Sequence, residues 1–253
     1  MCHNAYMAEA AGPRDGAGID ARFESAMRGL WVAFQPIVST RRRCTYGYEA
    51  FLRTDGEPTL SAPGELARAA ERLGHARALG RAVRARIAET AASNADALLF
   101  VHVHANDLDD FELYSSTSPL SKVARRVVLQ ITERHALDDV TGLLTKVKKL
   151  RALGFRIAID ELGEAHGLSS LSRLEPDVVK LAASLVRDVD RFSRKLCVVR
   201  SLVSLCCHEL EMSLVCEGVE TAAERDALAD AGCDLMQGCL FGGPGRELTS
   251  AAG

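Results

Sequence analysis

Four carboxylates stand inside or directly after short apolar runs of the sequence. Glu49 lies in YGYEAFLR, Asp160 and Glu161 in RIAIDEL, and Glu217 in SLVCEGV. If these acids converge, they cannot all stay ionised without a cation. Oxygen ligands of this kind favour Mg²⁺ or Mn²⁺. Lys180, in VVKLA, adds a cation for a water, a phosphate or a carboxylate, and the set best supports two metal ions flanking a phosphodiester.

The acids belong to a larger pattern, in which each apolar run contributes one polar residue near its end. In chain order these residues are Gln35, Glu49, His102, Gln130, Asp160, Lys180, Glu217 and Gln237. Such runs are strands whose ends meet at one face of a barrel, where catalytic and metal-binding groups gather. Arg53, four residues after Glu49, offers a two-pronged donor for a phosphate.

The elements that position these residues are eight predicted strands alternating with helices. The strand candidates are WVAFQPIVS, YGYEAFLR, LLFVHVHA, VVLQIT, RIAIDEL, VVKLA, SLVCEGV and LMQG. Only TRRRCT joins the first two, which is too short for a parallel crossover and predicts an antiparallel hairpin turning near Arg42. The fold class is therefore α/β, a TIM-like (β/α)8 barrel with the first strand antiparallel.

Helices are expected near residues 64–92, 138–152, 190–211 and 221–231, with shorter ones after Pro119 and around 168–174. Asp138 and Thr221 are candidate N-caps, and Gly154 and Gly232 candidate stops. We expect a flexible tail over residues 1–22, one barrel domain over 23–246 and a C-terminal tail over 247–253.

Bulk composition excludes several classes of protein. The net charge of −3 argues against a nucleic-acid polymer as partner, and no apolar run reaches membrane-spanning length. The first residues lack the features of a signal peptide. The eight cysteines include no CxxC pair, which predicts structural thiols in a reducing cytoplasm.

At this point the motifs resemble the EAL-domain family of cyclic-di-GMP phosphodiesterases, over about residues 30 to 246. FQPIV is similar to the family's first strand, YGYEAFLR to its signature strand, and IDELG to its Asp-Asp-Phe-Gly segment. VKLA, CEGVET and LMQGCLFGGP follow in the family's order. The resemblance implies the same barrel, metal ligands at Glu49 and at the matching strand ends, and catalytic roles for Lys180 and Glu217. It also implies ligand-binding roles for Gln35, Arg53 and Gln237.

The departures from the family lie at its metal positions. His102 replaces an Asn ligand, Gln130 a Glu ligand, Glu161 the second Asp, and Ala182 another Asp. An amide oxygen is a poorer ligand for a hard ion than a carboxylate, so a weakened metal site is expected at Glu49, His102, Gln130, Asp160 and Glu161. Because His102 favours softer ions, Mn²⁺ or Zn²⁺ is disfavoured less than Mg²⁺. Gln130 is expected to pair with His102 on the adjacent strand.

Two further motifs are Glu133 and the pair of His102 and His104. Glu133 matches a glutamate that steadies the loop after the fifth strand in the family, although the loop GEAHGLSS departs from the family pattern. His102 and His104 have the spacing of some barrel metallohydrolases, but the later strand ends provide no further histidine, and this alternative is set aside.

Three functions remain open. The first is a degenerate, catalytically impaired EAL domain that binds cyclic-di-GMP as a signalling or sensor module. The second is a residual Mg²⁺- or Mn²⁺-dependent phosphodiesterase that opens cyclic-di-GMP to linear pGpG, so the chain's status as an enzyme is uncertain. The third is a protein-interaction domain without ligand. The first is favoured because the substitutions remove two negative charges near Arg53 and Lys180. Its output is expected to pass through a homodimer or a partner protein.

Overall fold

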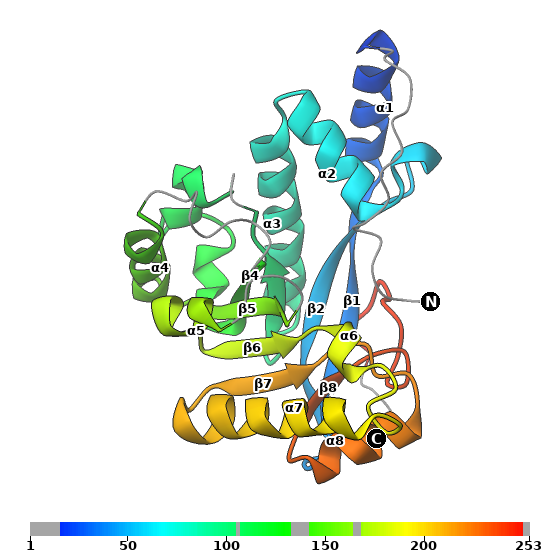
Figure 1. Cartoon of the computed structure of the whole chain (residues 1–253). Coiled ribbons are helices and arrows are strands. Elements are labelled where there is room, and N and C mark those ends of the chain that lie inside the picture. The colour runs from blue at the N-terminus through cyan, green and yellow to red at the C-terminus, as the bar shows by residue number, and fades with distance from the viewer. Residues whose placement is uncertain (1–15, 105–106, 133–141, 164–167, 250–253) are drawn as a thin grey trace.

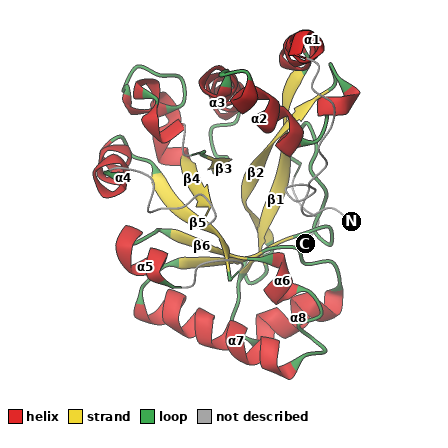
Figure 2. Cartoon of the chain, turned by 45° about the horizontal axis from the view of Figure 1, so that its top comes forward, coloured by secondary structure: helices red, strands yellow, loops and turns green. Residues whose placement is uncertain are grey.

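The computed structural model describes residues 16–104, 107–132, 142–163 and 168–249. Eight strands form a closed barrel in sequence order. The strands are β1 Leu30–Ser39, β2 Cys44–Thr54, β3 Leu99–His102, β4 Val127–Thr132, β5 Arg156–Leu162, β6 Val178–Leu181, β7 Ser213–Cys216 and β8 Leu235–Gln237. β1 runs antiparallel to both β2 and β8, and the other neighbours are parallel. The predicted barrel with a reversed first strand is confirmed, and Figure 2 shows helices beside most of its strands, with loops next to β1.

The β1–β2 hairpin is the longest pairing in the barrel and turns where the sequence predicted. Ser39 pairs with Cys44, and the three arginines between them are exposed. Gln35 lies opposite Glu49 in the same register. The reversed strand β1 therefore places Gln35 beside Glu49, as the sequence predicted.

An apolar layer of side chains packs inside the barrel. Because strand side chains alternate between faces, inward positions recur every second residue. The buried inward residues are Ile37, Phe100, Val128, Ala158, Val178, Val215 and Leu235. Each lies two residues from a polar residue of the predicted site, so the polar residues form the next layer of the interior. A larger apolar cluster fills the space between the strands and the surrounding helices.

Helices cover the outside of the barrel (Figure 1). The α-helices are α1 Gly16–Arg28, α2 Pro63–Arg72, α3 Ala76–Ser93, α4 Leu143–Ala152, α5 Ser169–Leu174, α6 Ala183–Val186, α7 Ser193–Val203 and α8 Ala222–Asp230. Short 3₁₀ helices cover Pro58–Leu60, Asp107–Asp109, Phe111–Tyr114 and Ser121–Arg126, and a π-helical turn, Ser204–Glu209, extends α7. Within the residues described, no helix combines the length and apolarity needed to cross a membrane.

Local signals explain most helix boundaries. Thr221 and Glu224 form a reciprocal capping box at the start of α8. Gly154 and Gly232 adopt φ values of 101° and 97° after α4 and α8, which confirms them as stops. The single helix predicted over 64–92 is wrong, because Gly74, at φ 72°, separates α2 from α3. Asp138 lies outside the described residues.

The first helix was not predicted, and it crosses the tail boundary placed at residue 22. α1 begins at Gly16, and its Phe23 and Ala26 are buried against Leu66 and Ala70 of α2. The structure thus has a helix over residues 16–22, where a tail was expected, and the domain bounds stay a prediction. The reason is tertiary: α1 gains its stability from a small apolar cluster that it shares with α2.

Candidate functional site

All eight predicted polar residues meet in one connected network above the apolar layer. Seven of them have buried side chains, and His102 is the more open member, with 36% of its side chain exposed. Buried polar groups are tolerated only when paired. The pairs observed run from strand to strand around the interior, so the layer is a single polar unit.

Glu49 is the centre of this unit. Its Oε1 atom accepts hydrogen bonds from Gln130 Nε2 at 2.9 Å and Lys180 Nζ at 2.8 Å, and lies 2.8 Å from His102 Nε2. Its Oε2 atom accepts one from Gln237 Nε2 at 2.5 Å. Burial alone raises the pKa of the Glu49 carboxyl, but the charge of Lys180 and the hydrogen bond to His102 hold that pKa well below its ordinary value.

Lys180 is fully buried among three carboxylates. Its Nζ atom lies 2.5 Å from Glu217, 2.8 Å from Glu49 and 3.7 Å from Asp160. Burial lowers the pKa of Lys180, but the surrounding acids raise it above its ordinary value, so the ammonium stays charged. Burial and the neighbouring acids Asp160 and Glu49 raise the pKa of Glu217 well above its ordinary value despite Lys180. One ammonium therefore lies among three acids, and the raised pKa of Glu217 favours the neutral, protonated form of that acid.

His102 bridges two of these acids. Its Nε2 atom faces Glu49, and its Nδ1 atom lies 3.4 Å from Asp160 Oδ2. Burial lowers the pKa of His102, but the hydrogen bond to Glu49 and the charges of Glu49 and Asp160 raise it above its ordinary value. The Phe51 ring lies 6.1 Å from the imidazole, at a tilt of 46°.

Gln130 contacts Glu49 where pairing with His102 was expected. Gln130 and His102 are register partners on β4 and β3, but the side-chain amide of Gln130 donates its hydrogen bond to Glu49. Within the described chain, the Oε1 atoms of Gln130 and Gln237 are buried without a hydrogen-bond partner. The predicted Gln130–His102 side-chain pair is thus replaced by an amide that donates to the acid and leaves its own acceptor unused.

Three residues of the site are placed so that they could hold a metal ion. Among the residues that the structure describes, Glu49, His102 and Asp160 form the group whose ligand atoms lie within 4.8 Å of one another. Ala182, at the position of a fourth acid, is buried and has no ligand atom. Gln130 faces this group through its Nε2 donor, whereas its Oε1 atom is buried without a hydrogen-bond partner among the described residues. This donor set offers one nitrogen and two carboxylate oxygens to a metal ion.

Glu161, also predicted as a metal ligand, is not part of this group. It is half-buried and adopts φ 57°, a left-handed conformation that is unfavourable for a residue with a side chain. Its backbone N–H donates to Asp160 Oδ1 at 2.9 Å, and the β5–β6 register shifts here. Asp160 points into the barrel by strand alternation, two residues after Ala158, and the irregularity begins beyond it, at Glu161.

Arg53 and Gln35 are the remaining ligand-binding predictions. Arg53 is half-buried on β2, on the same side as Glu49. It donates to its neighbour's carbonyl and lies 5.5 Å from the Phe51 ring, and it forms no ion pair with a carboxylate of the described residues. Gln35 accepts from Gln237 at 3.1 Å and donates to the carbonyl of Gly242 at 2.9 Å. Glu133 lies outside the described part of the chain.

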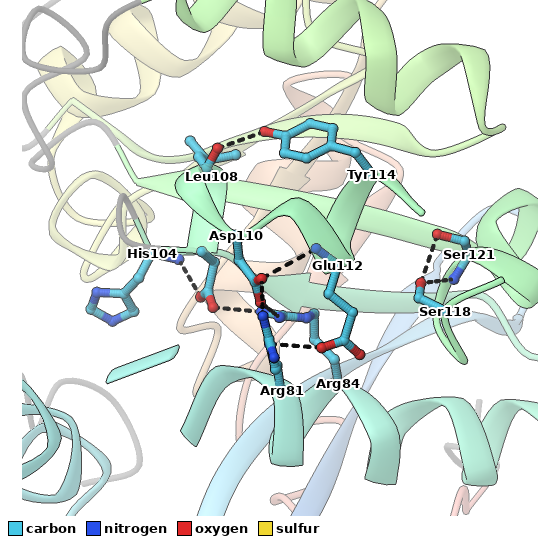
Figure 3. A network of polar contacts seen from close by, with 10 residues as sticks. Arg81, Arg84, His104, Leu108, Asp110, Glu112, Tyr114, Ser118 and Ser121 are labelled. Atoms are coloured by element: carbon cyan, nitrogen blue, oxygen red, sulfur yellow. Dashed lines mark hydrogen bonds and ion pairs between the residues drawn. The ribbon is translucent and has the colours of Figure 1, made fainter. Parts of the chain in front are cut away.

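A second network, which sequence reasoning missed, anchors the segment after His102 (Figure 3). Arg84 of α3 contacts Asp107 at 2.5 Å and Asp110 at 2.6 Å, and Arg81 contacts Asp110 at 2.9 Å. Asp107 accepts from the His104 backbone N–H at 3.1 Å. The hydrogen bond from Arg81 lowers the pKa of Asp110 to about 2. The matching three-residue spacings of the two arginines and the two aspartates were an available signal.

Comparison with known proteins agrees with this fold. The family model described as EAL domain matches residues 22–244. The bifunctional diguanylate cyclase/cyclic di-GMP phosphodiesterase MucR of Pseudomonas aeruginosa is 28% identical over 89% of this chain and 34% of MucR. The chain spans between 29% and 53% of the length of the first curated relatives that it matches.

Two solved structures show the same architecture. The FimX EAL domain of Pseudomonas aeruginosa, bound to c-di-GMP, has a TM-score of 0.80 at 25% identity, covering 91% of this chain and 98% of that one. The calcium and cy-diGMP complex of Klebsiella pneumoniae BlrP1 has a TM-score of 0.76 at 29% identity, covering 85% and 56%. The barrel with its buried acid–lysine layer is thus of the EAL type. This chain belongs to the EAL domain family.

Proposed function

We propose that this EAL domain binds cyclic-di-GMP and is impaired in hydrolysing it. The observation that carries the proposal is the contact between Gln130 and Glu49, in which a neutral amide holds the central acid as a hydrogen-bond donor. A hard divalent ion would have to displace that donor and would gain no charge from position 130. Together with Ala182, this supports a weakened Mg²⁺ or Mn²⁺ site.

Arg53 supports ligand binding. Its guanidinium has no carboxylate partner among the described residues, and it stands on the same face of β2 as Glu49. Such a group forms charge-assisted bonds to a phosphate. Gln35 and Gln237 form an adjoining pair of amides for the bases. MucR, FimX and BlrP1 are related proteins whose names or solved complexes include this nucleotide.

Titration calorimetry with cyclic-di-GMP tests the proposal. Arg53→Ala is expected to weaken binding by about 1.5–3 kcal/mol, the loss of a charge-assisted bond. Arg42→Ala removes an exposed cation of the hairpin turn and is the matched control. Equal affinity of wild type and Arg53→Ala contradicts the role of Arg53, and absence of wild-type binding supports the interaction-domain alternative.

Slow hydrolysis is a second candidate, because Lys180, Glu217 and Asp160 are all retained in contact. Chromatographic detection of linear pGpG, in Mg²⁺ and in Mn²⁺, separates the candidates. We expect very low activity in Mg²⁺. Robust turnover of the unmodified protein in Mg²⁺ contradicts the impaired-enzyme proposal.

A further inference from the structure

The β1–β2 hairpin extends beyond the polar layer and carries the one tryptophan of the chain, Trp31. Trp31 is the register partner of Arg53. Side chains of opposite residues in an antiparallel pair lie on the same face, with Cβ atoms about 5 Å apart. Alternation from Ile37 and Glu49 gives Trp31 and Arg53 the face of the polar layer. A tryptophan therefore stands beside the arginine that is proposed to hold a phosphate.

The opposite face of the same hairpin end is covered by helices. Leu30 and Leu52 pack into the apolar cluster of α1 and α2. Trp31 and Arg53, one residue further along each strand, consequently face away from those helices. Both are half-buried, so part of each side chain remains open to solvent.

The C-terminal segment brings a second arginine to this place. Past the end of β8, Gly245 lies beside β1 and exchanges two backbone hydrogen bonds with Phe34, at 2.7 and 3.0 Å. The carbonyl of Gly242 accepts a hydrogen bond from Gln35 at 2.9 Å. These bonds fix the course of the segment, and Arg246 follows directly after it.

Trp31, Arg246 and Asp55 form a connected group. The guanidinium carbon of Arg246 lies 3.9 Å from the centroid of the Trp31 ring, within the range of a cation–π contact. The indole Nε1 atom donates to Asp55 Oδ1 at 2.9 Å, and Arg246 forms an ion pair with Asp55 Oδ2. The side chains of Arg246 and Asp55 are 59% and 63% exposed, so their ion pair adds little to stability. The group offers a ligand an aromatic surface and charged donors at one place.

These groups suit a guanine base. Nucleobases stack on tryptophan side chains. Arginine donates to the O6 and N7 acceptors of guanine together, whereas adenine presents an amino donor at the position of O6. Arg246 contacts Asp55 through its Nη2 atom, and the guanidinium carries further N–H donors. Because Trp31 and Arg53 are cross-strand neighbours, a phosphate held by Arg53 leaves its nucleoside within reach of Trp31.

We infer that Trp31 and Arg246, oriented by Asp55, form the subsite for one guanine base of the nucleotide. Trp31 is the stacking surface, and Arg246 is the residue that selects guanine over adenine. The inference rests on the proposed binding of cyclic-di-GMP. It adds the hairpin end and the C-terminal segment to the amides proposed for the bases.

Trp31 provides a direct readout, because it is the one tryptophan of the chain. Cyclic-di-GMP is titrated into the unmodified protein while tryptophan fluorescence is followed, corrected for absorption by the nucleotide. Calorimetry measures the same titration. A base stacked on the indole is expected to quench the emission, with the midpoint that calorimetry gives. Cyclic-di-AMP is expected to bind at least about tenfold more weakly.

Variants assign the roles of the two residues. Trp31→Leu is expected to weaken cyclic-di-GMP binding about tenfold through loss of the stack, and Trp31→Phe is expected to retain most of the affinity. Arg246→Ala is expected to reduce the preference for cyclic-di-GMP over cyclic-di-AMP about tenfold. Arg225→Ala removes another arginine that pairs with an exposed aspartate, Asp226, and is the matched control. Thermal unfolding without nucleotide checks that each variant folds.

Calorimetry separates this inference from the proposed function. If the unmodified protein binds no cyclic-di-GMP, nucleotide binding and the base subsite both fail. If it binds while the tryptophan emission stays constant, or if Trp31→Leu binds as tightly as wild type, the base subsite alone is overturned. Equal guanine preference in Arg246→Ala and Arg225→Ala overturns the role of Arg246. Should Trp31→Leu not fold, the emission of the unmodified protein and the Arg246→Ala result decide.

Discussion

Replacing Gln130 by glutamate perturbs the polar layer at its centre. Gln130 and Glu49 are both buried, and their side chains are 2.9 Å apart. Gln130→Glu converts this hydrogen bond into a contact between two acids, which cannot both ionise at that distance. One acid must keep a proton, and holding it costs about 1.4 kcal/mol per pH unit above the unfolded pKa of about 4.3. The cost is thus about 1 kcal/mol at pH 5 and at most about 3.7 kcal/mol at pH 7.

Lys180 and His102 screen the repulsion, because both contact the same Glu49 oxygen. We therefore expect the Gln130→Glu protein to lose about 2–3 kcal/mol of unfolding free energy at pH 7, below the unscreened maximum, and less at pH 5. The sign follows from linkage: the folded-state pKa of the acid pair is raised, so the folded state binds more protons and the penalty grows with rising pH.

Chemical denaturation at pH 5 and pH 7, in chelator, measures this. Gln130→Met preserves the volume and removes the hydrogen bond without adding charge, so its loss of stability is expected to be about 1–2 kcal/mol and independent of pH. If the glutamate and methionine variants lose equal free energy at both pH values, charge repulsion is not the cause and the reasoning is refuted.

Three other measurements probe the remaining features. Gly80→Ala would place its Cβ atom 2.0 Å from Asp107 Oδ1. This overpacking is expected to cost about 1–3 kcal/mol of unfolding free energy. Gly243→Ala, which has open space around it, is the control and is expected to leave the unfolding free energy unchanged in the same denaturation assay. Because the pKa of His102 is raised above its ordinary value of 6.5, His102 contributes stability that is fully present below pH 6.5 and is lost as pH rises through the raised pKa. The difference in unfolding free energy between wild type and His102→Asn is therefore expected to shrink over that pH range. A difference that does not change with pH contradicts this role of His102. Restoring hydrolysis is expected to need four changes together, because the effects of residues that act as one unit are not additive. The changes are His102→Asn, Gln130→Glu, Glu161→Asp and Ala182→Asp. Chromatographic detection of linear pGpG from the single and combined variants measures this.

The barrel was predictable because its signals are local. Each strand is a short apolar run bounded by turns or helices, and the brief hairpin connection alone requires a reversed strand. The polar layer followed from the same pattern, since a polar residue two positions beyond a buried apolar one shares its face. Hence the positions of Glu49, Lys180 and Gln237 in one layer were correctly predicted.

What escaped prediction depends on tertiary contacts. α1 is stabilised by the cluster around Phe23 and Leu66, which no local periodicity reveals. The choice of Glu49 over His102 as partner of Gln130 depends on the side chains of three other strands that converge on the same oxygen. The left-handed backbone of Glu161 arises from a bulge in the β5–β6 pairing, for which the residue type gives no indication.

The apolar layer beneath the site has a kinetic consequence. Side chains from Ile37 to Leu235 fill the barrel interior below the acids, whereas His102, above them, is partly exposed. We therefore expect an ion to reach the acids past His102. A ligand bound over His102 would block the release of any ion that lies below it. Loading would then follow a compulsory order, with the ion entering first and leaving last.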